Sequence, residues 1–420
     1  MVAAYAVSQD DAWPFLTEGT KIGMAGVTIG ALVAIWIFLR VIWKPPPKGA
    51  ASKYKLPQFA QPLNASGAPD AAANPLNPGY GSINSGGAGA GKPPALDDGS
   101  GGRMLESGTV AGDYAEDWRK TFDATFLGIM TAMLVVCSVL TTLYIPGLWR
   151  DSGFWLCQLP KLGLMMAISL GGGALCRCYC SIDDNGYVIT KAGSKFKVNY
   201  TRKLQHFGAY LVPMIVKGGA TDPNPAWASL YLAWGQFFTL LAFLLLIKPL
   251  RERSTFLMIQ FNSMDRPEDR PNTMKWLIGG NIIPGTFLIV LFTHLYQPTN
   301  QAGLAMIFIF ITGLGDGFAE PVGITWGRHK YKTRACCSKD KFTRSWEGSA
   351  CVFMSGIVFP CTFYDSFANE TQMWMAIAIL PATMAYAEAT APHTMDTPVL
   401  MGLGGLILWA ITHYHPGVSY

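Results

Sequence analysis

The sequence predicts an all-α, polytopic integral membrane protein with about nine to ten transmembrane helices. Half of its 420 residues are hydrophobic and only 14% are charged, whereas soluble domains carry about 25% charged residues. The apolar residues gather in runs, and a membrane-spanning helix needs about 20 of them. The runs cover residues 22–43, 122–149, 162–176, 204–216, 227–247, 276–296, 304–314, 350–364, 372–389 and 398–413. Those beginning near 204, 304 and 350 are short, so we expect tilted, glycine-broken or partly re-entrant segments there.

The distribution of Lys and Arg supports this assignment of spans. If ten helices alternate in direction, the segments 44–121, 177–203, 248–275 and 314–346 share one side of the membrane, and they hold 27 of the 32 Lys and Arg residues. Basic loops concentrate on the cytosolic side of membrane proteins. We therefore expect this side to face the cytosol, stroma or matrix; the endoplasmic reticulum, a plastid and a mitochondrion all stay open. The net charge of +5 indicates membrane lipids as partners rather than nucleic acid.

Composition divides the chain into three parts. Residues 1–44 form an N-terminal segment with the first transmembrane helix. Residues 45–115 are rich in Gly, Ala and Pro and resemble a linker. Residues 116–420 carry the remaining apolar runs and are expected to form one membrane domain.

The strongest candidate for a functional site is a glycine-rich segment at the end of an apolar run. Asp316 and Glu320 stand one helical turn apart, so their carboxylates share a face and are suited to hold Mg²⁺ or position a hydroxyl. Gly315, Gly317 and Gly323 allow the backbone to approach phosphates closely. We expect Asp316 to lie at a loop entrance with few packed neighbours.

Two further groups of charged residues precede this segment. Arg202, Lys203 and His206 stand at the start of a span and are suited to bind phosphates. The alternative is that they anchor the helix by extending their side chains to the membrane surface. Residues 265–271 hold closely spaced acids, arginines and prolines, which indicates a self-paired turn.

Lys341, Arg344 and Ser345 lead into a later span. The two cations are suited to bind phosphate. Ser345 is also a good helix N-cap, and Glu347 in the first turn is favoured by the helix dipole. The functional and the structural interpretation are compatible here.

Glu388 and Asp396 lie between the last two spans, on the basic side of the predicted topology. Ionisable residues within membrane segments are expensive and mark functional sites. Because several such groups converge on one face, we expect a phosphate-bearing ligand and a lipid-soluble second substrate.

These motifs resemble the phytol kinase and dolichol kinase family of polyprenol kinases, which are relatives of the phosphatidate cytidylyltransferases. The likeness covers roughly residues 195–400 and rests on motifs that occur in the family's order. They are Arg202-Lys203-x-x-His206, Gly315-Asp316-Gly317-x-Ala319, Ser345-Trp346-Glu347-Gly348-Ser349, and Ala387-Glu388-Ala389 with Asp396.

The resemblance implies CTP-dependent, or other nucleotide-dependent, phosphorylation of an isoprenoid alcohol such as phytol, farnesol or dolichol, with Mg²⁺. It implies catalytic roles for Asp316, Glu320 and Asp396, and a metal-binding role for Asp316 and Glu388. The implied phosphate-binding residues are Arg202, Lys203, His206, Gly315, Gly317, Gly323, Lys341, Arg344 and Ser345.

A second hypothesis from another class is a non-catalytic accessory subunit of a large membrane complex, which retains the kinase-like fold for assembly or lipid binding. The extra N-terminal helix and the linker favour it. So do departures from the family's pattern, such as Glu320 where Asp is usual and Thr397 where Asn is usual.

Overall fold

The computed structural model describes residues 17–42, 95–97, 103–105, 122–189, 196–216, 228–266, 269–336, 341–392 and 395–413. Of the predicted linker 45–115, these ranges include two short strands, β1 (Ala95–Asp97) and β2 (Arg103–Leu105), which pair antiparallel. The rest of the linker lies outside the described residues.

The described residues are mainly helical, which confirms the predicted all-α class. The helices, with 3-10 and π turns labelled η, are α1 (Glu18–Ile37), η2 (Phe38–Ile42), α2 (Phe122–Tyr144), η6 (Pro146–Arg150), α3 (Ser152–Tyr179), α4 (Val198–Ile215), α5 (Ala228–Ala242), η8 (Phe243–Leu246), α6 (Lys248–Arg251), α7 (Thr255–Asn262), η10 (Lys275–Ile282), α8 (Ile283–Tyr296), η11 (Ala302–Leu304), α9 (Ala305–Phe310), η12 (Ile311–Asp316), α10 (Gly317–Thr325), α11 (Trp346–Thr362), η13 (Tyr364–Ser366), α12 (Glu370–Thr390) and α13 (Asp396–Thr412). Two further antiparallel pairs join β3 (Ser181–Ile182) to β4 (Val188–Ile189) and β5 (Lys330–Arg334) to β6 (Lys341–Ser345).

Five helical stretches of the described chain are long and apolar enough to cross a membrane. They are Glu18–Val41, Phe122–Tyr144, Ser152–Tyr179, Lys275–Tyr296 and Ala302–Thr325. Their outer faces are apolar: on α2, for example, Val135, Val139 and Leu143 are each at least half exposed. Exposed apolar side chains on a long helix are typical of contact with lipid. The structure thus supports a membrane protein.

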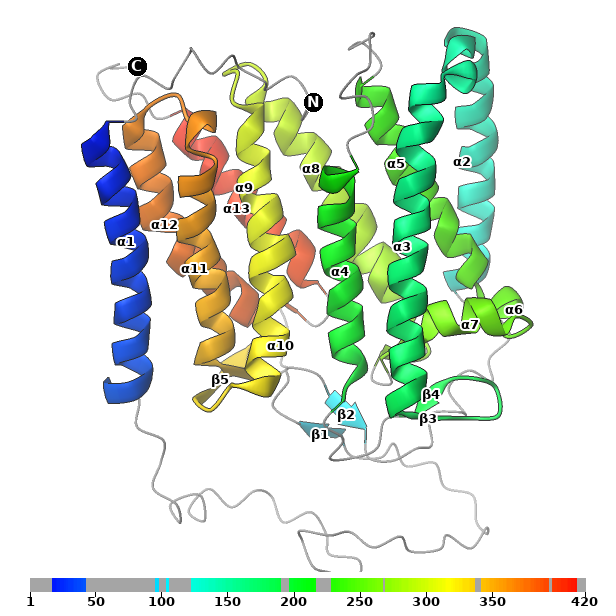
Figure 1. Cartoon of the computed structure of the whole chain (residues 1–420), viewed down its shortest axis with the longest axis horizontal. Coiled ribbons are helices and arrows are strands. Elements are labelled where there is room, and N and C mark those ends of the chain that lie inside the picture. The colour runs from blue at the N-terminus through cyan, green and yellow to red at the C-terminus, as the bar shows by residue number, and fades with distance from the viewer. Residues whose placement is uncertain are drawn as a thin grey trace, which may run out of the picture.

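The long helices run roughly parallel, and the short strands gather at one end of the bundle (Figure 1). Strands β1 to β5 and the short helices α6 and α7 all lie at or near this end. They belong to the four segments that carry most of the Lys and Arg, so the described parts of these segments share one end of the molecule. We call it the basic end.

Two apolar cores stabilise the bundle. One gathers buried residues of α8, α9, α11, α12 and α13, including Phe308, Met373 and Leu408. The other gathers residues of α2, α3, α5 and the elements around α7, including Phe154 and Phe261. Helix α4 contacts α3 on one side and both η12 and α10 on the other. It therefore stands between the halves that hold the two cores.

The helix that carries the glycine-rich segment is longer than predicted. The sequence suggests a span that ends near residue 314, but the helical stretch continues to Thr325. A π-helical turn, η12, includes Gly315 and ends at Asp316. Such turns are rare and frequent at functional sites. Asp316 is 3% exposed inside a continuous helix, so the expected position at a loop entrance is wrong.

Candidate functional site

The centre of the candidate site is a buried lysine between two carboxylates. Lys203 Nζ on α4 lies 2.8 Å from Asp316 Oδ2 and 3.8 Å from Glu320 Oε2. The predicted common face of the two acids is therefore confirmed. Lys203 is only 7% exposed, so its side chain does not extend to the membrane surface. A charge removed from water to this degree requires a partner of opposite sign.

His206 lies one turn further along α4 and faces the same helix. Its Nε2 donates to the carbonyl of Thr312 over 3.1 Å and lies 3.9 Å from Asp316 Oδ2. The ring of Tyr210 stands 4.9 Å from the His206 ring. These contacts place three consecutive turns of α4 against η12 and the start of α10.

The loop before η10, which includes Arg266 and Asp269, contributes further residues to the site besides those of α4 and of the helix through Asp316. Asp269 accepts from Arg202 Nη1 and from Arg266 Nε, both over 2.8 Å. Arg266 Nη1 in turn lies 3.5 Å from Glu320 Oε1, which also accepts from Asn199 Nδ2 over 2.6 Å. Arg202, Asp269, Arg266 and Glu320 thus form a chain of alternating charge.

This row of ion pairs includes two residues, Arg266 and Asp269, that were not predicted to belong to the site. The loop does pair with itself, as predicted, because Arg270 Nε lies 2.7 Å from Asp265 Oδ2 and Arg266 pairs with Asp269. Its additional contact with Arg202 connects positions 67 residues apart. In the sequence, the one signal was the dense alternation of charge in residues 265–271. It fits a self-paired turn as well as a part of the site.

The segment before α11 supplies the next charges. Arg344 Nη1 lies 3.0 Å from Glu388 Oε1 on α12. Ser345 caps α11, as predicted, by accepting from the backbone N–H of Gly348 over 3.1 Å. Glu347 lies in the first turn of α11, as predicted, and accepts from the backbone N–H of Arg328 over 2.9 Å. The side chain of the predicted phosphate ligand Lys341 lies outside the described part of the structure.

A small polar cavity opens among these elements. Its lining includes Glu320, Arg344 and Glu388 together with Ser345, Gly348 and Ser349 of the α11 start. Beside it, Tyr331 of β5 shares a hydrogen bond with Ser349 Oγ over 2.6 Å. Burial raises the pKa of Tyr331, so its hydroxyl stays protonated at neutral pH.

Asp396 completes the cluster from the start of α13. Its carboxylate accepts from the backbone N–H of Thr397 over 2.9 Å. Within the described residues it forms no ion pair, but it interacts electrostatically with Lys203, Arg202 and His206. Asp316 lies close enough to Asp396 and Glu388 for their like charges to repel it. The predicted charged residues whose side chains are described therefore lie in one neighbourhood, which we call the charged cluster: Arg202, Lys203, His206, Asp316, Glu320, Arg344, Glu388 and Asp396.

The glycines of the site have a packing role. A Cβ on Gly315 would lie 2.2 Å from Ser355 Oγ, and one on Gly323 would lie 2.9 Å from Ser345 Oγ. Both contacts bring the helix of Asp316 close to α11, since small residues allow close approach of membrane helices. A role of Gly315, Gly317 and Gly323 in phosphate binding stays a prediction.

The donor chemistry of the cluster suits Mg²⁺ that arrives with a nucleotide. Among the described residues, no three His, Cys, Asp or Glu side chains form a group that holds a metal ion by itself. Mg²⁺ in nucleotide sites is usually held by one or two carboxylates together with phosphates. Asp316 and Glu388 carry such oxygens, and in the structure they pair with Lys203 and Arg344. Mg²⁺ binding here stays a prediction.

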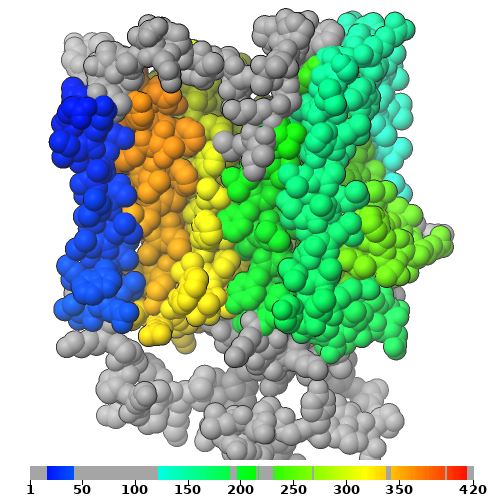
Figure 2. All heavy atoms as spheres, viewed as in Figure 1, coloured from blue at the N-terminus to red at the C-terminus, as the bar shows by residue number. Residues whose placement is uncertain are grey.

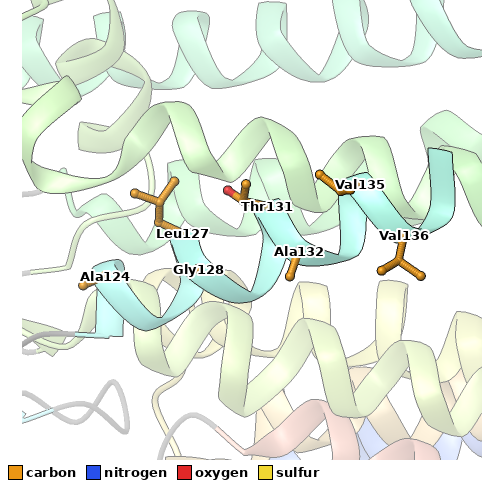
Figure 3. A pocket seen from close by; sticks show the side chains of 7 residues that line it. All are labelled: Ala124, Leu127, Gly128, Thr131, Ala132, Val135 and Val136. Atoms are coloured by element: carbon orange, nitrogen blue, oxygen red, sulfur yellow. The ribbon is translucent and has the colours of Figure 1, made fainter. Parts of the chain in front are cut away.

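A larger hollow lies away from the cluster, along α2 (Figure 3). It measures about 680 Å³, and its lining has no charged residue. The lining residues all come from α2 and are Ala124, Leu127, Gly128, Thr131, Ala132, Val135 and Val136. Helix α2 packs mainly against η6 and η8, and Figure 1 shows it at the edge of the bundle opposite α1. This hollow has the chemistry of a lipid contact, and the candidate site remains at the charged cluster.

No model of a protein family, no curated protein and no solved structure matches this chain.

Proposed function

We propose that this protein is a membrane phosphotransferase that transfers a phosphoryl group from a nucleoside triphosphate, typically CTP, to a long-chain isoprenoid alcohol such as phytol, farnesol or dolichol. The observation that carries the proposal is the buried Lys203, held between Asp316 and Glu320 at the predicted motif. The nearby Arg344–Glu388 pair and Asp396 support it. Buried charges of both signs at the end of a membrane bundle indicate a functional site rather than a purely structural one.

Phosphoryl transfer needs positioning and electrostatic stabilisation more than covalent chemistry from the protein. We assign Arg202, Lys203 and Arg344 to the phosphates of the nucleotide. The carboxylates of Asp316 and Asp396 orient the alcohol's hydroxyl and hold Mg²⁺. Bound Mg²⁺ neutralises charge on the phosphates.

The arrangement of charges also suggests how the site becomes active. In the structure Lys203 neutralises Asp316. An incoming triphosphate offers Lys203 a second anionic partner, which leaves the Asp316 carboxylate available to the hydroxyl. The same cluster thus is stable before binding and becomes catalytic after it.

The proposal includes a finer topology than the five long spans alone. We propose that the shorter helices α4, α5, α11, α12 and α13 also cross the membrane, which gives the nine to ten spans expected from the sequence. The basic end then faces the cytosol, stroma or matrix, where nucleotides are found. The start of α1 at Glu18 then lies on the opposite side.

The direct test is a transfer assay with the full chain in detergent or liposomes. The protein is incubated with Mg²⁺, CTP labelled at the γ-phosphate and each of the three alcohols. We expect label in the lipid-extractable isoprenoid phosphate, and less of it with ATP. If neither nucleotide supports transfer to any alcohol, while deletion of residues 45–115 disrupts a larger complex, the accessory-subunit hypothesis replaces the enzyme.

A further inference from the structure

Two phenylalanines meet where α4 and α10 pack together. The ring centroids of Phe207 on α4 and Phe318 on α10 are 4.7 Å apart. Gly317 makes room for this pair, because a Cβ there would lie 2.4 Å from the Phe207 ring. The Phe207 ring therefore lies against the backbone directly after Asp316. We call these two residues the aromatic pair.

The aromatic pair lies beside the buried ion pair of the charged cluster. Lys203 and Phe207 are four residues apart on α4 and so share a helix face. Lys203 and Asp316 are buried, whereas Phe318 is 50% exposed. Figure 2 shows α4 and α10 side by side on one face of the molecule, so the junction between them reaches the surface. The half-exposed Phe318 thus lies two residues from the buried Asp316, at a junction that reaches the surface.

We infer that this junction is the entrance for a lipid-soluble alcohol, whose isoprenoid chain lies against Phe318 while its hydroxyl reaches Asp316. The inference rests on the proposed function and names where its lipid substrate binds. A chain dissolved in the bilayer approaches the bundle from the side, where Phe318 is half exposed. Aromatic rings offer large apolar contact areas to such a chain.

The hollow on α2 is the competing location. It is apolar and roomy, but its lining has no charged residue and comes from a helix that packs against η6 and η8. A chain bound there would hold its hydroxyl away from Asp316. The α4–α10 junction combines the exposed Phe318 with the helix turns that carry Lys203 and Asp316.

The test is photo-crosslinking with a farnesol analogue that carries a diazirine on its chain. The full-length protein in nanodiscs is irradiated with the analogue in the absence of nucleotide, and the labelled peptides are identified by mass spectrometry. We expect label on the α4 and α10 peptides, and we expect excess unlabelled farnesol to prevent it. Phe318→Ala should lower this labelling about fivefold or more, and Phe318→Leu should retain most of it.

Phe287→Ala is the matched control, because Phe287 is a 63% exposed phenylalanine on α8. It should leave the labelling unchanged. Label concentrated on α2, label that farnesol does not displace, or equal labelling of Phe318→Ala and wild type would each overturn the inference. Because the readout needs no turnover, displaceable label at the junction without transfer activity would reject the kinase and retain the binding site. Transfer activity together with label on α2 would support the kinase and reject the α4–α10 junction as the binding site.

Discussion

At the scale of single residues, Asp269 is the point where the loop before η10 connects to the site. Its carboxylate binds Arg202 and Arg266, and Arg266 extends the contact to Glu320. Asp269 is 4% exposed and touches no proposed reacting atom. We therefore regard it as a positioning residue, which holds in place the arginine that we propose binds phosphate.

Asp269→Asn should raise the KM for CTP about tenfold with a smaller change in kcat. The amide keeps its size but loses the charge that fixes the Arg202 guanidinium, and about 1.4 kcal/mol of lost binding corresponds to tenfold. Steady-state kinetics at varied CTP concentration provide the measurement.

Asp265→Asn is the control within the same loop. Asp265 pairs with Arg270 and accepts from Thr273, two residues that do not belong to the charged cluster. Its replacement should lower the melting temperature and leave the KM for CTP unchanged. Equal effects of the two variants on KM would show that the loop acts only through general stability.

At the scale of elements, close helix packing depends on individual glycines. Gly356 on α11 faces the backbone of α12, where an added Cβ would lie 2.7 Å from the Cα of Pro381. Backbone atoms cannot move aside as a flexible side chain does. By contrast, a Cβ on Gly402 of α13 would lie 3.9 Å from Leu288 Cδ1, an ordinary contact.

Gly356→Ala should therefore destabilise the bundle by about 1–3 kcal/mol, the usual cost of overpacking. Gly402→Ala should be neutral or slightly stabilising, since alanine favours the helix. Thermal unfolding in the same detergent compares the two variants. If Gly402→Ala is the more damaging, the packing of α11 against α12 is not as described.

The helices show how far sequence reasoning extends. Runs of apolar residues predict long elements such as α2 and α12 well, because hydrophobicity alone determines them. The helix through Asp316 was underestimated, since glycines lower helix propensity when a segment is considered alone. Glycine is needed at positions 315 and 317 because a Cβ there would collide with Ser355 and Phe207, respectively. Such tertiary packing is not visible in the sequence.

The same limit applies to the site. The shared face of Asp316 and Glu320 follows from helical spacing, and the cap at Ser345 follows from local chemistry. The contact between Arg202 and Asp269 joins segments far apart in the chain. No local pattern specifies that pairing, so it could be found only in the folded structure.

At the scale of the whole molecule, the basic end provides a test of topology. Asp184 lies in the exposed turn between β3 and β4, and Arg150 is exposed at the end of η6. Figure 1 shows these two elements at opposite ends of the bundle.

In a chain without other cysteines, Asp184→Cys and Arg150→Cys should react with a membrane-impermeant maleimide from opposite sides of sealed vesicles. Asp184→Cys should react from the side that faces the cytosol, stroma or matrix. Reaction of both positions from the same side would contradict the assignment of α3 as a membrane-spanning helix.

We propose that the buried charges at the basic end catalyse phosphoryl transfer rather than merely stabilise the bundle. Asp316→Asn leaves Lys203 partly unpaired, and breaking a buried pair costs about 3–5 kcal/mol. Combining it with Lys203→Gln removes both charges and should restore much of that stability. Loss of an electrostatic contact to the transition state lowers the rate about 100-fold or more.

The decisive measurement compares melting temperature and CTP-dependent transfer in wild type, Asp316→Asn and the double variant. We expect the double variant to regain stability, while transfer stays at least about 100-fold below wild type in both variants. A double variant that regains transfer together with stability, or an Asp316→Asn protein with wild-type transfer, would contradict a catalytic role for the cluster.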